Sequence, residues 1–310
     1  MLNEDSFKDI VGSDNTFNPS KSYAFKNKSR PSGLTYDVPK YLTVKGYLAE
    51  DAFEILPNKG VRHEFVLGNT VNNNEALKSS DGKYHTGRLG FASASQWRSS
   101  VLYQWWRYFE NENVCLHVTE DKDKNVKQSV VAIGVTPPKN RLFLSYKNPR
   151  NSDWNRAYIS DFTVESKPTR WASSQLMIDS ASDKIRVPRW TFDRAVELFN
   201  AQYDNITAEY YVQCNKAKSL GFQISNATIE IPFENLVEKL HGDSRFCRLL
   251  IGKVDWDLIY LGMPFFINRG VCMDHSKDNV LSLYDAGYRE NNVIFDNAEE
   301  NGAYVWRHDY

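Results

Sequence analysis

Short apolar runs separated by turn residues recur along most of the chain. They predict β-strands, because each run has about the length of a strand and is bounded by glycine, proline or charged residues. The runs are 41–48, 52–56, 114–118, 126–135, 142–146, 157–164, 175–178, 210–213, 222–224, 228–231, 249–251, 258–261 and 279–283. The charged residues 120–124 fall between two runs and predict a solvated hairpin turn. The pattern therefore predicts a mainly β protein.

Two segments have helical spacing instead. One is an apolar stripe at i, i+3, i+4 and i+7, which predicts a helix packed on the core, formed by Leu102, Trp105, Trp106 and Phe109. The other follows Pro188 and covers about residues 191–203. The polar residues 1–40 predict loops between short strands, and the polar residues after 290 predict a loose tail.

Length and charge narrow the class of protein. The chain has 310 residues, enough for two domains, and we expect a boundary near Pro137-Pro138. This divides the chain into 1–138, 139–290 and a polar tail, 291–310. Lys and Arg number 38 against 39 Asp and Glu, a balance that argues against a nucleic-acid partner. The mean hydropathy is -0.55, and the sequence shows neither a membrane span nor a secretory signal.

Several kinds of chemistry are excluded by missing motifs. The sequence has no glycine-rich phosphate loop and no G-x-S-x-G nucleophile turn. Its six histidines are scattered and its four cysteines form no CxxC pair, so we expect no metal and no cofactor. Cys115 and Cys272 lie in apolar strand patterns, which indicate buried, unreactive thiols.

One turn carries a candidate catalytic group. The apolar strand 175–178 is followed by Asp179 and then by the small residues Ser180, Ala181 and Ser182. The pattern suits an ordinary strand stop at an Asx turn. It also suits a carboxylate presented on a tight turn, where small neighbours let backbone N–H groups approach it.

The order of segments around Asp179 resembles that of the pepsin-like aspartic peptidases. Their second lobe has an apolar-apolar-Asp-Thr/Ser-Gly turn, a proline and a helix, then paired cysteines and a Leu-Gly strand. The corresponding segments here are 179–181, Pro188, 191–203, 210–214, 229–232, Cys247, 260–268 and 271–274. The first half is similar at 15–22, 34–36, 45–51 and 86–92. The resemblance covers about residues 15–285.

The resemblance implies a fold, a site and a setting. The fold would be two β-barrel lobes with a cleft between them, the N-terminal lobe being incomplete. Asp179 would be the second-lobe catalytic aspartate, braced by Ser180. Tyr36 on the flap, with Ala181 and Ser182, would contact an extended peptide or protein in the cleft.

The resemblance also implies a disulfide, an oligomeric state and a location. They are a Cys214–Cys247 disulfide, a monomer, and an extracellular or lysosomal location. Three glycosylation sequons, beginning at Asn27, Asn205 and Asn226, are compatible with that location.

The first catalytic motif has no counterpart. The family's chemistry needs two carboxylates that share a proton, so that one acts as base while the other acts as acid. Upstream of Phe17 the sequence offers Asp5 and Asp9 but no Asp-Thr/Ser-Gly turn. Ala181 also replaces the usual glycine. We therefore expect a catalytically degenerate family member; the alternatives are an active endopeptidase whose N-terminal segment is missing here, and a non-catalytic extracellular binding protein.

Overall fold

The computed structural model describes most of the chain. The described residues are 1–11, 16–36, 42–56, 59–73, 109, 111–121, 126–147, 156–164, 167–168, 174–180, 182–215, 218–225, 227–240, 245–255, 257–274, 280–287, 295 and 303–309. They form two compact units, Met1–Glu110 and Asn111–Tyr310. Both units are mainly β, as the apolar pattern predicts.

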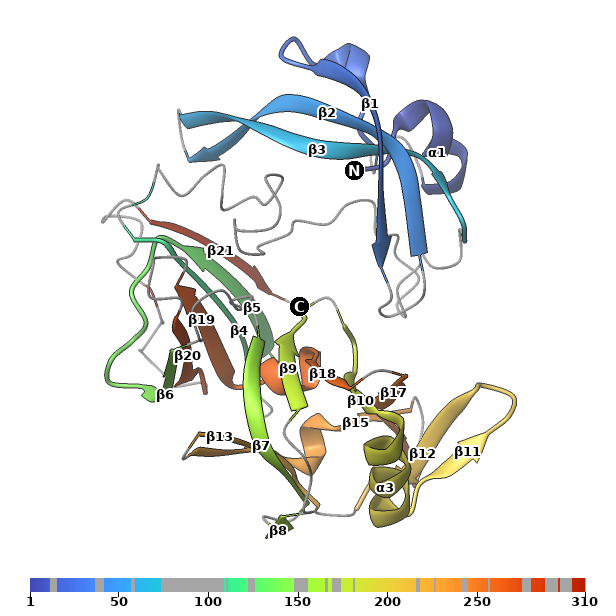
Figure 1. Cartoon of the computed structure of the whole chain (residues 1–310), viewed down its shortest axis with the longest axis vertical. Coiled ribbons are helices and arrows are strands. Elements are labelled where there is room, and N and C mark those ends of the chain that lie inside the picture. Colours follow the sequence, from blue (N-terminus) through green and yellow to red (C-terminus); the bar gives the residue numbers. More distant parts are fainter. Residues whose placement is uncertain are drawn as a thin grey trace. The chain divides into compact units, whose positions relative to one another are not determined.

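The first unit is built on an antiparallel meander, which we call sheet I. Its strands are β1 (Lys26–Tyr36), β2 (Leu42–Leu56) and β3 (Lys59–Val71) (Figure 1). Two short strands were expected where β2 is one continuous strand. The strand does not end between them, because residues 49–51 also pair with β3. A β-carbon at Gly46 would overlap the carbonyl of Leu67, so only glycine fits this approach.

Aromatic side chains fill the core of the first unit. Phe65 of β3 packs edge-on against Phe17 and Phe53, with ring centroids 5.5 and 5.7 Å apart. The helix α1 (Glu4–Val11) and the short turn η2 (Pro19–Lys21) precede the sheet. The expectation that residues 1–40 form loops and short strands was therefore wrong, since β1 runs for 11 residues despite containing a proline and a glycine.

The second unit contains an antiparallel sheet whose strands come from distant parts of the chain, which we call sheet II. In spatial order they are β21 (Tyr304–Asp309), β5 (Val126–Ile133), β4 (Asn113–Asp121), β19 (Arg269–Asp274), β20 (Val280–Asp285) and β6 (Leu142–Lys147). The β4–β5 hairpin confirms the predicted pair of strands around the charged turn. The loose tail was a wrong prediction for 304–309, because β21 pairs with β5 along its whole length.

A mixed sheet, sheet III, carries the candidate site. In spatial order its strands are β14 (Ala227–Ile231), β13 (Leu220–Ile224), β7 (Arg156–Val164), β9 (Ser174–Ile178), β18 (Leu258–Leu261), β10 (Ile185–Pro188) and β17 (Ile251–Val254), with β8 (Lys167–Pro168) paired to β7. Its interior is apolar, because Phe162 and Phe222 are fully buried with ring centroids 5.6 Å apart.

A smaller antiparallel sheet, sheet IV, lies beside the helix α3 (Arg189–Phe199) in sequence and space. Its strands are β11 (Gln202–Asp204), β12 (Glu209–Gln213), β16 (Phe246–Leu249) and β15 (Val237–Lys239). The predicted helix is confirmed, but it stops at Asn200, which adopts a left-handed conformation with φ 51°. Phe192 of α3 packs on Tyr210 with ring centroids 5.0 Å apart. The turns η5 (Phe233–Asn235) and α4 (Met263–Phe266) complete the unit.

Two disulfides cross-link the second unit. The expected Cys214–Cys247 bridge is confirmed and joins the end of β12 to β16. The prediction of free thiols at Cys115 and Cys272 was wrong, because these residues face each other across β4 and β19 and form a bridge. They are 157 residues apart in sequence, so their spacing gave no sign of the pairing.

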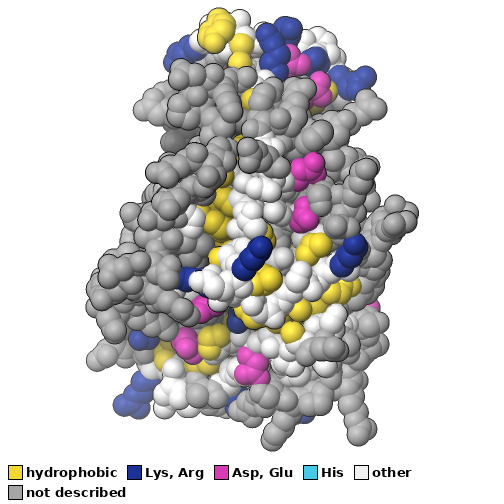
Figure 2. All heavy atoms as spheres, turned by 90° about the vertical axis from the view of Figure 1, so that its left-hand side faces the viewer, with side chains coloured by type: hydrophobic (Ala, Val, Ile, Leu, Met, Phe, Trp, Pro, Cys, Tyr) yellow, Lys and Arg dark blue, Asp and Glu magenta, His cyan; other side chains and the backbone are white. Residues whose placement is uncertain are grey.

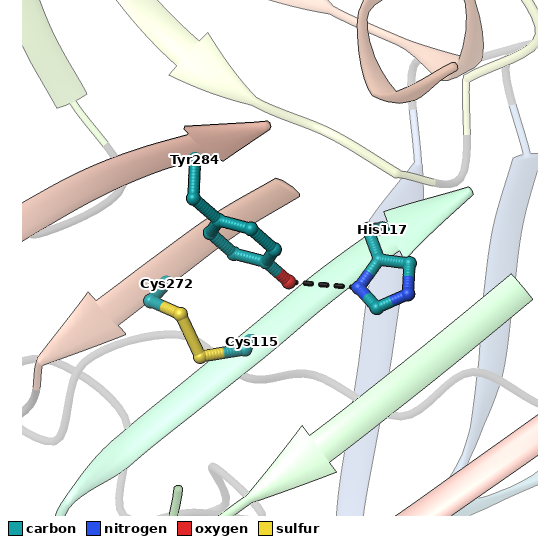
Figure 3. The surroundings of a disulfide bond; sticks show 4 residues. All are labelled: Cys115, His117, Cys272 and Tyr284. Atoms are coloured by element: carbon teal, nitrogen blue, oxygen red, sulfur yellow. Dashed lines mark hydrogen bonds between the residues drawn. A yellow bond between two sulfur atoms is a disulfide. The ribbon is translucent and has the colours of Figure 1, made fainter. Parts of the chain in front are cut away.

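A buried polar pair lies next to the Cys115–Cys272 bridge (Figure 3). The Tyr284 hydroxyl and His117 Nδ1 are 2.8 Å apart, and both side chains are buried. The Tyr284 ring covers Gly270 so closely that a β-carbon there would overlap it. Burial raises the pKa of Tyr284, so its hydroxyl stays protonated and can donate to the imidazole.

The helical segments and the surface charge complete the fold. The predicted stripe at 102–109 lies outside the described residues except for Phe109, which is buried. In the described part of the chain, no helix is long and apolar enough to cross a membrane. On the face shown in Figure 2, basic and acidic side chains of the coloured residues are interspersed, in keeping with the nearly neutral composition.

Candidate functional site

Asp179 stands where a strand ends and the chain turns. It comes directly after β9, and its backbone N–H donates to the carbonyl of Leu261 at 3.0 Å. The Ser182 N–H then donates to the Asp179 carbonyl at 3.1 Å, which closes a tight turn. Asp179 is half-buried and Ser180 is exposed. The turn thus holds a carboxylate at the end of a buried strand.

The strand order of sheet III explains why the chain turns there. β9 and β10 are consecutive in sequence, yet β18 lies between them. β18 runs parallel to β9, with Leu261 beside Ile178, and antiparallel to β10. The turn from Asp179 to Lys184 must therefore pass over the end of β18, which sets its position.

Gly262, at the end of β18, lies directly under the turn. A β-carbon at this position would overlap the carbonyl oxygens of both Ser182 and Lys184. The next residue, Met263, donates its N–H to the Ser182 carbonyl at 2.7 Å. The absence of a side chain at Gly262 is thus what allows two backbone segments to touch here.

Ser182 supports the turn from within. Its side chain is fully buried, and its Oγ donates to the Lys184 carbonyl at 2.8 Å. The same Oγ accepts from the Lys184 N–H at 3.4 Å. These two bonds use the hydroxyl inside the turn, which favours a supporting role over the substrate contact expected from the resemblance.

A chain of ion pairs extends the support to sheet IV. Lys184 Nζ lies 2.5 Å from Glu209 Oε2 on β12, and Arg248 of β16 lies 3.5 Å from the other oxygen of Glu209. Arg248 also contacts Glu238 of β15 at 2.5 Å. The side chain of Lys184 is 13% exposed, so this pair is screened less than a surface pair. The carboxylate of Glu209 is thus the counter-charge of the partly buried Lys184.

The short helix α4, which begins right after Gly262, is held by a partly buried cation, Arg269. Arg269 donates to the carbonyls of Phe265 at 3.4 Å and Glu230 at 2.7 Å, and its guanidinium lies 5.1 Å from the Phe265 ring centroid. Burial lowers the pKa of Arg269 to about 10, against the opposing effect of Asp285. The guanidinium still carries its charge at neutral and acidic pH. Sequence reasoning missed this residue because its partners are backbone carbonyls.

The structure describes only some of the other expected site residues. Tyr36 ends β1 and pairs with Leu42 of β2, and its side chain lies outside the described part of the structure. Ala181 and the segment 86–92 also lie outside it. The acidic residues Asp5 and Asp9 lie on the helix α1, not at a strand end. Among the described residues, no group of three or more potential ligands is placed to hold a metal ion.

Comparison with known proteins gives the family. A family model described as "Eukaryotic aspartyl protease" matches residues 5–282 of the chain. No curated protein matches the chain significantly. Members of the matched family bind peptide substrates in a cleft and are typically extracellular or lysosomal, and the two disulfides fit such compartments. The mainly β architecture agrees with the pepsin-like fold. The chain therefore belongs to the eukaryotic aspartyl protease family.

Proposed function

We propose that this 310-residue polypeptide binds extended peptides as a pepsin-like protein without hydrolysing them. One contrast carries the proposal. The described backbone of the Asp179 turn is held by several hydrogen bonds, whereas Asp5 and Asp9, upstream of Phe17, lie on a helix and not at a strand end. The sequence offers an Asp-Ser turn of the family's type at Asp179 and no Asp-Thr/Ser-Gly turn upstream of Phe17.

The chemistry explains why one carboxylate is insufficient. Peptide hydrolysis needs a base to take a proton from the attacking water and an acid to protonate the departing amine. Two carboxyls that share one proton perform both tasks, because like charges at close range cannot both ionise. A single carboxylate can provide only one of these tasks at a time.

Peptide binding, unlike hydrolysis, does not require two carboxylates. An extended peptide can be held by main-chain hydrogen bonds of the strand type, which need positioned backbone and not a reacting dyad. In this proposal Asp179 and the exposed Ser180 face the peptide, Tyr36 lies on the flap, and Ser182 supports the turn from beneath. We propose that the protein acts as a monomer in an oxidising compartment.

A second candidate is an active endopeptidase whose first aspartate is supplied from outside this sequence. The intact support of the Asp179 turn favours it. Gly262, Ser182 and Met263 all keep contacts that hold the carboxylate in place. The two candidates differ in whether the 310-residue chain cleaves peptides.

The test measures cleavage and binding on the same protein. At about pH 4, where a shared-proton dyad works, we expect no cleavage of an unfolded protein substrate. A peptide inhibitor containing statine should still bind by isothermal titration calorimetry. Asp179→Asn should weaken that binding by about tenfold, the loss of one charged hydrogen bond. Asp193→Asn, an exposed change on α3, is the matched control and should leave binding unchanged.

Two outcomes contradict the proposal separately. Inhibitor-sensitive cleavage that Asp179→Asn abolishes would show that the chain is an enzyme. Failure of the folded protein to bind any statine peptide would remove the peptide-binding claim and favour a non-catalytic role elsewhere on the surface.

A further inference from the structure

The tip of the β11–β12 hairpin is among the most exposed described parts of the second unit. The strands pair Tyr203 with Tyr210 and Asp204 with Glu209, and residues 205–208 form the turn between them. Asn205 is exposed, and Ile206 is 95% exposed. Ala208 has a φ of 57°, which lets the chain return to β12 within the short turn.

Side-chain bonds fix the conformation of this turn. Asp204 accepts from the Ile206 N–H at 2.9 Å and from the Thr207 hydroxyl at 3.1 Å. The Tyr211 hydroxyl donates to Thr207 Oγ1 at 3.1 Å. Asn205 contributes no side chain to these bonds, so a group attached to its amide would leave the turn intact.

The sequence of the turn is that of an acceptor for N-linked sugars. Asn205, Ile206 and Thr207 form an Asn-x-Thr sequon, in which the Thr hydroxyl assists transfer to the Asn amide. Two residues earlier, Tyr203 is 51% exposed, with its ring centroid 4.9 Å from that of Tyr210. An aromatic ring supported on one side and open on the other suits packing against the C–H groups of a sugar.

We propose that Asn205 carries an N-linked oligosaccharide whose first N-acetylglucosamine packs on Tyr203. The donor is a lipid-diphosphate-linked oligosaccharide, used by the transferase of the secretory pathway. The bond from Asn205 Nδ2 to sugar C1 forms, and the bond from C1 to the diphosphate oxygen breaks. The amide proton goes to a base of the transferase, and the lipid diphosphate leaves. Both disulfides agree with passage through that oxidising compartment.

The sequon at Asn27 is the natural comparison. Asn27 lies within β1, opposite Ala49, and its Oδ1 accepts from the Ser29 N–H at 2.6 Å. The side-chain oxygen of Asn27 is therefore held by the local backbone, whereas the bonds that fix the β11–β12 turn do not use the side chain of Asn205. The third sequon, at Asn226, lies outside the described residues.

The glycan would also change the surface of the hairpin. Ile206 and Tyr203 are exposed apolar side chains, and such residues in one place favour association between molecules. A sugar chain at Asn205 covers both and keeps the hairpin solvated. Loss of the sugar should therefore raise self-association as well as lower stability.

The test uses the full chain, directed into the secretory pathway of insect cells by a cleavable signal peptide. Cell extract and medium are analysed together, so that occupancy is read whether or not the protein is released. Peptides are treated in heavy-oxygen water with an amidase that removes N-glycans. Each Asn that carried a glycan becomes an Asp labelled with heavy oxygen, and this label is the mark of occupancy. We expect the mark at Asn205, its loss in Asn205→Gln and Thr207→Ala, and its retention in Thr207→Ser and in the control Asn27→Gln.

A second measurement tests the packing on Tyr203. Enzymatic removal of the glycan should lower the Tm of the purified protein, and the same treatment of Tyr203→Ala should not. An unmarked Asn205 in protein that has formed both disulfides would overturn the site. A marked Asn205 whose deglycosylation lowers the Tm of Tyr203→Ala as much as that of the unaltered chain would overturn the contact with Tyr203.

Discussion

The two units differ in strand order and in covalent cross-links, and therefore in what stabilises them. Sheet I joins strands that are consecutive along the chain, and its core is a cluster of aromatic rings without a disulfide among the described residues. Sheet II draws strands from residues 113 to 309 and is bridged by Cys115–Cys272. Local hairpins close short loops at small entropic cost, whereas distant strands close long ones at greater cost. Both covalent bridges lie in the second unit, in which strands distant along the chain pair with each other.

The largest effect should come from removing the bridge of sheet II. The Cys115–Cys272 bond closes a loop of 157 residues. By the chain-entropy model, a bridge across a loop of this length stabilises the folded state by about 5 kcal/mol. The double variant Cys115→Ala, Cys272→Ala should lose that stability in the second unit and leave sheet I intact. Hydrogen exchange read separately for β2 and β4 checks this. Equal loss of protection in both strands would mean that the units unfold together.

The shorter bridge should matter less. Cys214–Cys247 closes a loop of 33 residues, worth about 4 kcal/mol on the same scale. Cys214→Ala with Cys247→Ala should therefore lower the urea midpoint of the second unit by less than the first pair does. If the order were reversed, loop length would not explain the role of the bridges.

A single methyl group should disturb the site beneath Asp179. Gly262→Ala places a β-carbon against the Ser182 and Lys184 carbonyls and should cost about 2–3 kcal/mol, as overpacking does. Gly252→Ala is the matched control, because its β-carbon would meet only side-chain atoms at 3.5 Å or more. Thermal unfolding measures the cost, and statine-peptide binding shows whether the turn has moved. Equal effects of the two variants would contradict the close approach.

The smallest effect is a difference in the response of the units to acid. Lys28 and Arg62 hold the pKa of Glu50 in sheet I below its usual range, mainly by hydrogen bonding. Its contribution, below about 1 kcal/mol, is present above the ordinary Glu pKa and lost as the pH falls through the lowered one. Burial, and then Asp274, raises the pKa of Glu112 in the second unit. Its contribution has the opposite sign, being present at low pH and lost as the pH rises through the raised pKa.

Two Gln variants separate these contributions. Glu50→Gln should flatten the acid sensitivity of sheet I near and below about pH 4, and Glu112→Gln should flatten the loss of stability of the second unit above that pH. Hydrogen exchange corrected for intrinsic rates gives both profiles. An acid profile of sheet I that Glu50→Gln leaves unchanged would assign the sensitivity to another carboxylate.

Local patterns were sufficient to predict the elements around the candidate site. The strand before Asp179 and the helix after Pro188 are each specified by a few neighbouring residues, and both are confirmed. The Cys214–Cys247 bridge was expected from the order of segments shared with the family. In these cases the information lies within one element or in a familiar succession of elements.

Features that depend on distant residues could not be predicted in the same way. Cys115 and Cys272 each lie in an ordinary apolar strand, and only the neighbouring positions of β4 and β19 pair them. β21 was missed for another reason: its residues Tyr304, Val305 and Trp306 favour a strand, but the Asn- and Glu-rich residues before them led to the prediction of a loose tail. α1 was missed although its sequence carries a helical signal, because Phe7, Ile10 and Val11 have i, i+3, i+4 spacing and Glu4 and Asp5 lie in its first turn.

The position of β18 between β9 and β10 has a consequence for the order of assembly. While the chain is being synthesised, β9 and β10 emerge early and lack the strand that separates them. The Asp179 N–H finds its acceptor only when Leu261 has emerged, and the turn reaches its final form only then. A nascent chain that ends before residue 258 therefore carries Asp179 without the site. The Asp179 carboxylate is therefore synthesised well before the turn that presents it can form.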